Sequence, residues 1–175
     1  TFAVRTPQEL DQLASRAGLQ SPWPQDLPGN PAGVLLTDPN GVQVRVAWFE
    51  NWQSVPTCEA VPPATRGADR PRTNSPLRHA RVPSRVLRLG HMVLGTPRWE
   101  TTARFYIDTL GLIPSDVQAL PDGRPEVAFM RCDRGAEAAD HQTFVVARLP
   151  LVDIEHAAFE VPDLDAVGMG GQILR

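Results

Sequence analysis

The stretch His91-Met-Val-Leu-Gly-Thr-Pro97 has two counterparts in the chain, and the three together decide the fold. The counterparts are His156-Ala-Ala-Phe-Glu-Val-Pro162 and Thr1-Phe-Ala-Val-Arg-Thr-Pro7. In each, an apolar run that suits a β-strand leads to a proline six residues after the first position, and then to a segment with helical spacing. The repeat predicts one fold unit used three times, with a matched histidine in two of the copies.

The first copy predicts the order strand, helix, strands. Thr6-Pro7 supplies a helix N-cap and a proline at the first helical position, and Gly18 ends the helix. The turn Asp38-Pro-Asn-Gly41 then joins two strands. The apolar residues with helical or strand spacing are Leu10, Leu13, Ala14 and Ala17 in the helix, residues 33–37 in one strand and Val42, Val44 and Val46 in the next.

The second copy repeats this order, and the third begins it again. We predict a strand at 86–94, a helix started by Thr96-Pro97 and ended by Gly111, and a turn at Pro121-Asp-Gly123. Further strands are predicted at 127–130 and 143–147. The third copy predicts a strand at 154–161 and a helix from Pro162 to the end of the chain. The residues predicted for the inner face of the second helix are Thr102, Phe105, Tyr106 and Leu110.

The composition is that of a globular protein with a hydrophobic core, because 42% of the 175 residues are hydrophobic and 21% are charged. The formal net charge of −3 argues against a nucleic-acid-binding protein. No apolar run approaches the ~20 residues of a membrane-spanning helix, and no secretory signal is visible. Cys58 and Cys132 lack a Cys-x-x-Cys spacing, so we interpret them as free thiols. We therefore expect a cytoplasmic protein without nucleic-acid or membrane partners.

A proline- and arginine-rich segment separates the first copy from the other two. Residues 51–85 hold six prolines and six arginines with little apolar periodicity. This favours an inter-domain linker over the alternative, a basic anion-binding arm. We therefore predict one domain part at 1–50, a linker at 51–85 and a second domain at 86–175. Because Thr1 begins inside a strand pattern and Arg175 closes a helical one, we expect the chain to be part of a longer protein.

The two matched histidines predict a metal site. Side chains alternate along a strand, so His91 shares a face with Val93, and His156 with Ala158. If the two units pair about a pseudo-two-fold axis, both imidazoles can point into one cavity. Two imidazoles suit Fe(II), Zn, Ni, Cu or Mn, and a carboxylate with open positions would indicate non-haem Fe(II). The alternative is a pair of ordinary strand histidines bonded to backbone or solvent, and the shared position in two repeats favours ligands.

No carboxylate in the chain fits well as the third ligand. Glu155 is expected to point to the opposite strand face from the neighbouring histidine. Glu160 shares that histidine's face, but four residues of extended strand place it ~13 Å away. Asp140 and Glu126 remain alternatives. The natural position is the last strand of the truncated third unit, beyond Arg175.

A third histidine, His141, has two interpretations. It precedes the strand predicted at 143–147 and could transfer protons near the site, because histidine titrates near neutrality. The alternative is an exposed turn histidine after Asp140, which the local sequence favours. His79 lies in the segment 51–85 and is given no functional role.

Four stretches together resemble the vicinal oxygen chelate superfamily: Leu89-Gly-His91-Met-Val-Leu, Phe105-Tyr-Ile-Asp-Thr-Leu-Gly-Leu112, Asp140-His-Gln-Thr143 and Ile154-Glu-His156-Ala-Ala-Phe-Glu-Val161. More closely, they resemble the two-domain type I extradiol ring-cleavage dioxygenases, such as dihydroxybiphenyl and catechol 2,3-dioxygenases. The resemblance covers residues 86–175, and residues 1–50 as the later half of a degenerate domain. It implies an α+β fold of repeated βαβββ modules, paired in two domains around a curved mixed sheet, with the chain truncated at both ends.

The resemblance also implies a ligand set. In that family the C-terminal domain binds one Fe(II), or in some members Mn(II). By motif, His91 and His156 take the positions of two metal ligands, and the third is a glutamate expected beyond Arg175. His141 takes the position of the acid/base histidine, although many relatives have His-His-Thr here and a second alignment matches the threonine instead. Thr1 in place of a histidine implies that 1–50 belong to a metal-free N-terminal domain and 86–175 to the metal-binding C-terminal domain.

The implied activity is extradiol (meta) cleavage of a catechol-type aromatic diol with O2 at a mononuclear non-haem Fe(II) centre. One alternative is another metal enzyme on this scaffold, a glyoxalase-like isomerase or a thiol transferase. The other is a non-catalytic binding protein of the bleomycin-resistance kind. The metal-free first half argues against the former, and the histidines in register argue against the latter. The expected small-molecule partners are the diol and O2. Further copies of the chain are also expected as partners, because exposed sheet edges in such folds often associate.

Overall fold

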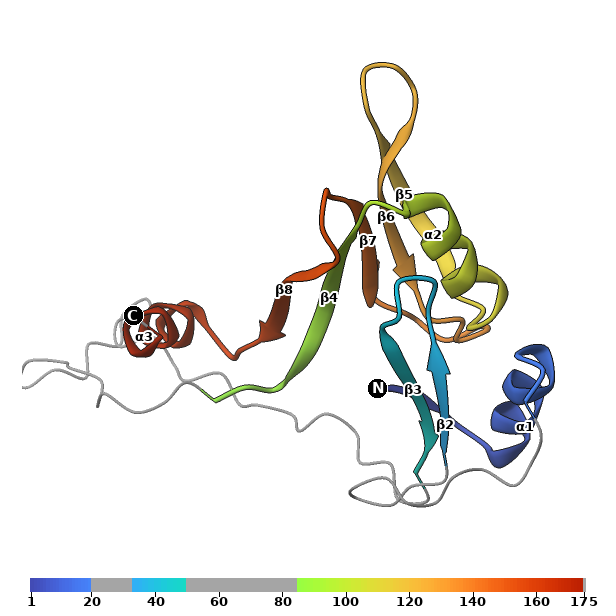
Figure 1. Ribbon diagram of the computed structural model, residues 1–175. Coiled ribbons are helices and arrows are strands. Elements are labelled where there is room, and N and C mark those ends of the chain that lie inside the picture. The colour runs from blue at the N-terminus through green and yellow to red at the C-terminus, as the bar shows by residue number, and fades with distance from the viewer. Residues whose placement is uncertain (20–32, 50–84, 175) are drawn as a thin grey trace, which may run out of the picture. The chain divides into compact units, whose positions relative to one another are not determined.

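Eight strands and three helices make up the part of the chain described by the computed structural model, which is residues 1–19, 33–49 and 85–174 (Figure 1). All but the last residue of the linker predicted at 51–85 lies outside the described residues. The mixture of two open sheets with a few short helices confirms the α+β class.

The first copy of the repeat folds as predicted. It consists of β1 (Phe2–Val4), α1 (Pro7–Arg16), β2 (Gly33–Thr37) and β3 (Gln43–Trp48). In its three-stranded sheet, β3 lies between β1, to which it is parallel, and β2, to which it is antiparallel. The Thr6 hydroxyl accepts from the Glu9 backbone N–H, and the Glu9 carboxylate accepts from the backbone N–H of Thr6, so a capping box starts α1.

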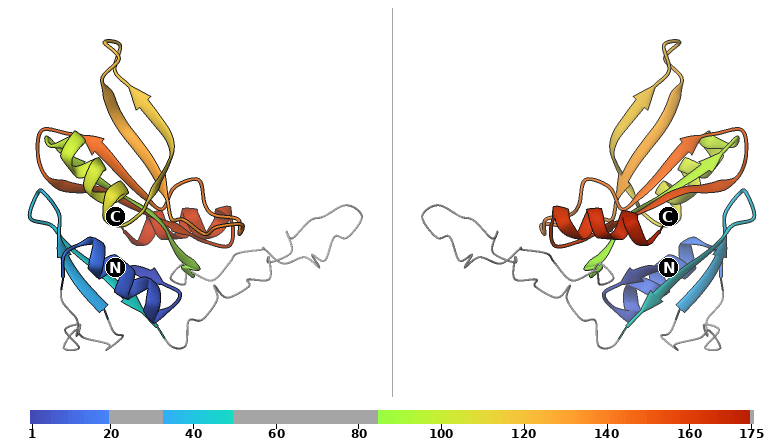
Figure 2. Two further views of the ribbon diagram at one scale, coloured as in Figure 1. Left: turned by 90° about the vertical axis from the view of Figure 1, so that its right-hand side faces the viewer. Right: turned by 90° about the vertical axis from the view of Figure 1, so that its left-hand side faces the viewer.

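The second copy forms a complete βαβββ module. It consists of β4 (Arg88–Thr96), α2 (Trp99–Asp108), β5 (Ile113–Ala119), β6 (Pro125–Arg131) and β7 (Phe144–Arg148). The third copy adds β8 (Asp153–Glu160) and α3 (Leu164–Ile173). The five-stranded sheet has the order β5-β6-β7-β4-β8. Figure 2 shows β5 and β6 as a hairpin, which turns at the predicted Pro121-Asp-Gly123, where Gly123 has a φ of 84°. Strand β5 was not predicted.

Matching strand pairs show that the two copies are the same unit. As β1 runs parallel to β3, so β4 runs parallel to β7. Phe2 pairs with Val46 in the first sheet, and Met92 pairs with Phe144 in the second. Phe2 and Met92 each follow the first position of the repeat, which is a threonine in one copy and a histidine in the other. The internal repeat is therefore confirmed in strand register as well as in sequence.

The predicted start of α2 at Thr96-Pro97 is wrong. Thr96 is the last residue of β4 and is fully buried, and the helix begins at Trp99. The Thr96 hydroxyl donates to Asn40 Oδ1 at 2.8 Å and accepts from the Arg98 backbone N–H at 2.9 Å. The Thr96 hydroxyl thus bonds to Asn40, far away in the sequence, and Thr96 is not the N-cap residue that the local sequence predicts.

A single hydrophobic cluster joins the two modules. The rings of Phe2, Tyr106 and Phe144 contact one another, with centroids 6.5 Å apart for Phe2 and Tyr106, 4.2 Å for Tyr106 and Phe144, and 5.9 Å for Phe2 and Phe144. The Tyr106 hydroxyl donates to the buried Asp38 carboxylate at 3.5 Å, and burial together with that carboxylate raises the phenol pKa. The other buried members are Leu10, Leu13, Val34, Leu36, Val44, Val46, Leu94, Trp99, Ala103, Leu112, Ala128, Met130 and Val146.

Backbone contacts divide the described chain into two compact units. Residues 1–19, 33–49 and 91–157 belong to the first unit, and residues 85–90 and 158–174 to the second. This grouping does not follow the boundaries 1–50, 51–85 and 86–175, which stay a prediction about domain organisation. Within the described residues, no helix is long and apolar enough to cross a membrane.

Candidate metal centre

The two matched histidines meet across neighbouring strands. His91 lies in β4 and His156 in β8, and these strands are adjacent in the five-stranded sheet. The two Nε2 atoms are 3.2 Å apart, and the rings stand edge to face with centroids 5.3 Å apart. The predicted pairing of the two first strands is therefore confirmed, and the structure brings both imidazoles to one point.

The neighbouring glycine allows β4 to lie close to β8. A Cβ atom at Gly90 would lie 3.3 Å from the backbone oxygen of Ala158. A side chain at this position would press on the backbone of the partner strand. In the Gly90-His91 pair, the glycine thus allows the two strands to lie close together, and the histidine supplies a side chain that can bind metal.

The geometry of the pair fits a shared metal ion. Two imidazole nitrogens held at about 2.0–2.1 Å from one ion lie about 3 Å apart when the angle at the metal is between a right angle and the tetrahedral value. The observed 3.2 Å agrees with this separation. His91 is half-buried and His156 is exposed, so the site opens to solvent. The donor set of two neutral imidazoles suits Fe(II), Mn(II) or Zn(II).

One carboxylate contacts the pair, and the sequence analysis had placed it wrongly. The Glu155 carboxylate accepts a hydrogen bond from His156 Nδ1. Strand alternation had predicted that Glu155 points away from this ring. Strand β8 is the last in the sheet order, and the Glu155 side chain is half-exposed, so it has room to turn back toward the histidine.

The other carboxylates do not complete a ligand set among the residues that the structure describes. No group of three or more histidine, cysteine, aspartate or glutamate side chains converges there. The Glu160 carboxylate accepts from Arg88 Nε at 2.5 Å and is held in that ion pair. Neither Asp140 nor Glu126 joins the histidines. The glutamate ligand predicted beyond Arg175 stays a prediction.

His141 lies in the loop between β6 and β7 and does not contact the pair. Its Nδ1 is 2.8 Å from Gln142 Oε1, and its ring centroid is 6.0 Å from that of Phe129. The side chain is exposed. The structure therefore brings His91 and His156 together and leaves His141 apart from them, so its proton-transfer role stays a prediction.

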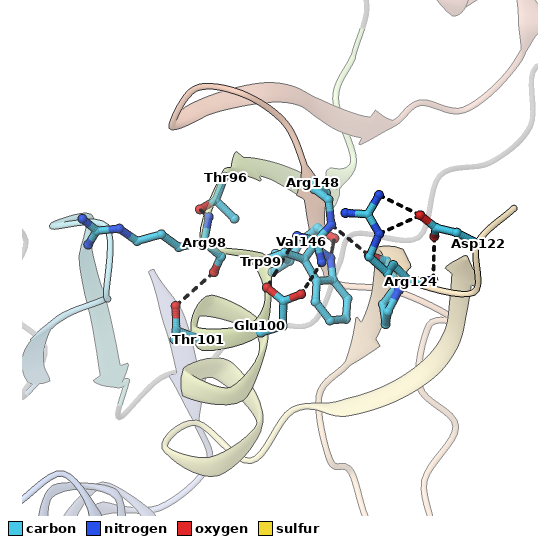
Figure 3. Close-up of polar contacts among 10 residues, drawn as sticks. Thr96, Arg98, Trp99, Glu100, Thr101, Asp122, Arg124, Val146 and Arg148 are labelled. Atoms are coloured by element: carbon cyan, nitrogen blue, oxygen red, sulfur yellow. Dashed lines mark hydrogen bonds and ion pairs between the residues drawn. The ribbon is translucent and has the colours of Figure 1, made fainter. Parts of the chain in front are cut away.

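A second polar cluster lies at the start of α2 and was missed by the sequence analysis (Figure 3). The Trp99 indole N–H donates to the Val146 backbone oxygen at 3.0 Å. The Arg148 guanidinium stands 5.6 Å from the Trp99 ring centroid and donates to Glu100 at 2.5 Å. This hydrogen bond holds the pKa of the Glu100 carboxyl below its usual value. These contacts fix α2 against β7.

A surface depression of about 320 Å³ runs beside this cluster along α2. Its lining contains no histidine or cysteine. The lining residues are Trp99, Glu100, Ala103, Arg104, Ile107 and Asp108.

Comparison with known proteins gives one curated relative and several solved structures. The chain is 31% identical over 148 residues to metapyrocatechase 2 of Cupriavidus necator, an alignment that covers 81% of this chain and 41% of the relative. No protein-family model matches the chain. The chain thus spans less than half the length of this relative.

The solved structures share the fold at low sequence identity. The Mn(II)-bound glyoxalase of Novosphingobium aromaticivorans has a TM-score of 0.62 and 21% identity, covering 98% of this chain and 48% of that one. A catechol 2,3-dioxygenase has a TM-score of 0.61 and 23% identity, covering 99% and 55%. A 2,3-dioxygenase of Pseudomonas sp. KL28 has a TM-score of 0.65 and 16% identity, covering 98% and 57%. These likenesses show the fold of βαβββ modules, and together with the similarity to metapyrocatechase 2 they confirm the resemblance to the vicinal oxygen chelate superfamily.

Proposed function

We propose that the protein cleaves the ring of a catechol-type diol with O2, in the extradiol position, at a mononuclear non-haem Fe(II) centre. The observation that carries the proposal is the histidine pair, whose Nε2 atoms meet at 3.2 Å from the same position of two repeated modules. The similarity to a metapyrocatechase supports this kind of reaction. The proposal concerns the whole protein, because this chain covers only 41% of the length of metapyrocatechase 2.

His91 and His156 would hold the ion through Nε2, with Mn(II) as the alternative to Fe(II). When bound, the iron supplies Lewis acidity toward the diol oxygens and the redox chemistry that O2 requires. The protein's part is to orient the diol and to present open coordination positions on the solvent side of the pair. A carboxylate ligand from a strand beyond Arg175 would complete the set.

His141 is the proposed proton-transfer group. Its Nδ1–H donates to Gln142 Oε1 at 2.8 Å, which leaves Nε2 as the basic atom. Nε2 would accept a proton from a diol hydroxyl and return it later. His141 does not contact the histidine pair. This role therefore requires the diol to lie between the loop that carries His141 and the pair.

A second candidate is a glyoxalase-like isomerase. The Mn(II)-bound glyoxalase shares the fold over 98% of the chain, so the scaffold alone does not decide between the two reactions. An isomerase would need the metal and no O2. Consumption of O2 therefore separates the two candidates.

The experiment loads the protein with Fe(II) without air, adds a panel of catechols, and then admits O2. We expect a coloured ring-opened product from at least one diol, with one O2 consumed per ring. H156A should lose the iron, whereas H141A should keep it and turn over slowly. Bound iron with no ring-opened product from any diol would contradict the dioxygenase proposal.

The same proposal includes a cytoplasmic homo-oligomer. Strand β8 is last in its sheet order, and its Ile154 and Phe159 side chains are both 57% exposed. Apolar side chains on such a strand suit association with another chain. Light scattering after size-exclusion chromatography measures the oligomeric state, and a monomer at micromolar concentration would contradict this part.

A further inference from the structure

We infer that Glu155 is a positioning residue that fixes the tautomer of His156 and so prepares one of the two metal-binding nitrogens before any metal arrives. The metal-binding half of this inference rests on the proposed function. The tautomer half stands on the contacts of the chain alone.

The contact between Glu155 and His156 determines which ring nitrogen carries the proton. A neutral imidazole has one N–H donor and one acceptor nitrogen, and a carboxylate only accepts. Because the Glu155 carboxylate contacts Nδ1, the proton resides on Nδ1. Nε2 of His156 is then a free lone pair, directed at Nε2 of His91 at 3.2 Å. Carboxylates that bond the outer nitrogen of a metal-binding histidine act in this way in many metal sites.

The same contact makes the two histidines unequal. Two facing lone pairs at 3.2 Å would repel, so Nε2 of His91 must carry a proton and donate it to His156. His91 must therefore move this proton to Nδ1, or release it, when a metal binds. His156 needs no such change, because Glu155 already holds its proton on the outer nitrogen.

Strand β8 offers a matched control for Glu155. Glu160 lies in the same strand and is also exposed, but its carboxylate is held by Arg88 at 2.5 Å and does not contact a histidine. A variant of Glu160 removes the same charge from the same strand. E160Q therefore reports the effect on metal binding of removing from this strand a carboxylate that does not contact a histidine.

The first test reads the tautomers directly, without metal. Nitrogen-15 spectra of the labelled chain at about pH 8, well above the ordinary histidine pKa, distinguish Nδ1–H from Nε2–H, and H156Q assigns the signals. We expect Nδ1–H for His156 and Nε2–H for His91. E155L should release His156 into a mixture of tautomers, and E160Q should leave it unchanged. Nε2–H on His156 in the wild-type chain would overturn the inference.

The second test measures Zn(II) affinity, since Zn(II) is diamagnetic and suits imidazole ligands. We expect E155L to bind Zn(II) about tenfold more weakly, near the lower end of the range for such partners because Glu155 is half-exposed. E155Q can still accept from Nδ1 and should lose less, and E160Q should match the wild type. Equal affinities for E155L and wild type, with equal circular dichroism, would overturn the positioning role.

The two tests also separate the inference from the proposed function. If the whole protein takes up no Zn(II) at the histidines, the proposed metal centre fails together with the metal-binding half of the inference. The tautomer spectrum still decides the role of Glu155 in that case, because it needs no metal.

Discussion

The modules at residues 1–48 and 88–148 share strand order and register, but they use equivalent positions differently. The first position is Thr1 in one module and His91 in the other. The sixth is Thr6, which caps α1, and Thr96, which is buried and bonded to Asn40. In the first module, the sixth position caps a helix. In the second module, the first position holds a side chain that can bind metal, and the sixth makes a tertiary hydrogen bond. Repeated backbones can thus serve separate roles with few substitutions.

The connections before the last strand of each module differ in the same way. In the first module, the short turn at Asp38–Gly41 is held by the Asp38 carboxylate, which accepts from the backbone N–H groups of Asn40 and Val42. In the second, the connection at 132–143 is longer and carries His141. The tight turn anchors the modules to each other, and the longer loop is where a functional side chain can vary.

The largest effect is expected at the tight turn. D38A removes a buried acceptor and leaves the N–H groups of Asn40 and Val42 and the Tyr106 hydroxyl without their partner. An unpaired buried donor costs about 1–3 kcal/mol, and two of these three donors are only partly buried, so we expect the free energy of unfolding to fall by about 3 kcal/mol, the lower end of the sum. Urea denaturation measures it. D122A, in the exposed turn of the other module, is the control and should lose less; equal losses would contradict the anchoring role.

The two equivalent threonines should differ when each is replaced by alanine. T6A removes an exposed helix cap, which costs about 1 kcal/mol. T96A removes a fully buried hydroxyl together with its hydrogen bonds to Asn40 and to the Arg98 backbone N–H, and we expect about 2 kcal/mol. Thermal or urea unfolding of both variants checks this order. A larger loss in T6A than in T96A would mean that the two positions are not used as the structure indicates.

The smallest effect on the free energy of unfolding is expected from E137Q, which removes the ion pairs of the loop that carries His141. Arg5 and Arg134 donate to Glu137 at 2.7 and 2.8 Å and hold the pKa of its carboxyl below the usual 4.5. A lowered pKa stabilises the fold above the unfolded-state pKa, and this stabilisation is lost as the pH falls through the folded-state pKa. The wild type should exceed E137Q slightly in stability at pH 7.

The difference between wild type and E137Q should shrink once the pH falls below about 4.3, the ordinary glutamate pKa, and close below the lowered folded-state pKa, where the carboxyl is protonated in both states. Unfolding curves of both proteins across this range measure it. E126Q removes a carboxylate that makes no ion pair within the described residues, so it serves as the control. A difference that grows as the pH falls would contradict the assignment.

Much of the fold could be predicted because its signals are local. Thr6-Pro7 with Glu9 starts α1 where the sequence placed it, and the bounds of β2 match the predicted 33–37. Strand β5 was missed because Pro114-Ser-Asp116 interrupts the alternate apolar positions Ile113, Val117 and Ala119, and the strand is mostly exposed. It is a strand because it pairs with β6, which local sequence does not encode.

The candidate site could be predicted only in part, for a similar reason. The matched positions of His91 and His156 were readable from the repeat, and the structure brings them together. The Glu155 contact was not readable, because alternation along a strand places neighbours on opposite faces and ignores the reach of a long side chain at a sheet edge.

The central claim is that His91 and His156 form a metal centre that the first module lacks. The direct measurement is Fe(II) binding without air, by competition with a chromogenic chelator, for the whole wild-type protein and for its H91T variant, which carries the residue that the first module has at this position. We predict that the wild type binds one ion per chain and that H91T binds it more than about tenfold more weakly. Equal Fe(II) affinity in the two proteins would contradict the account.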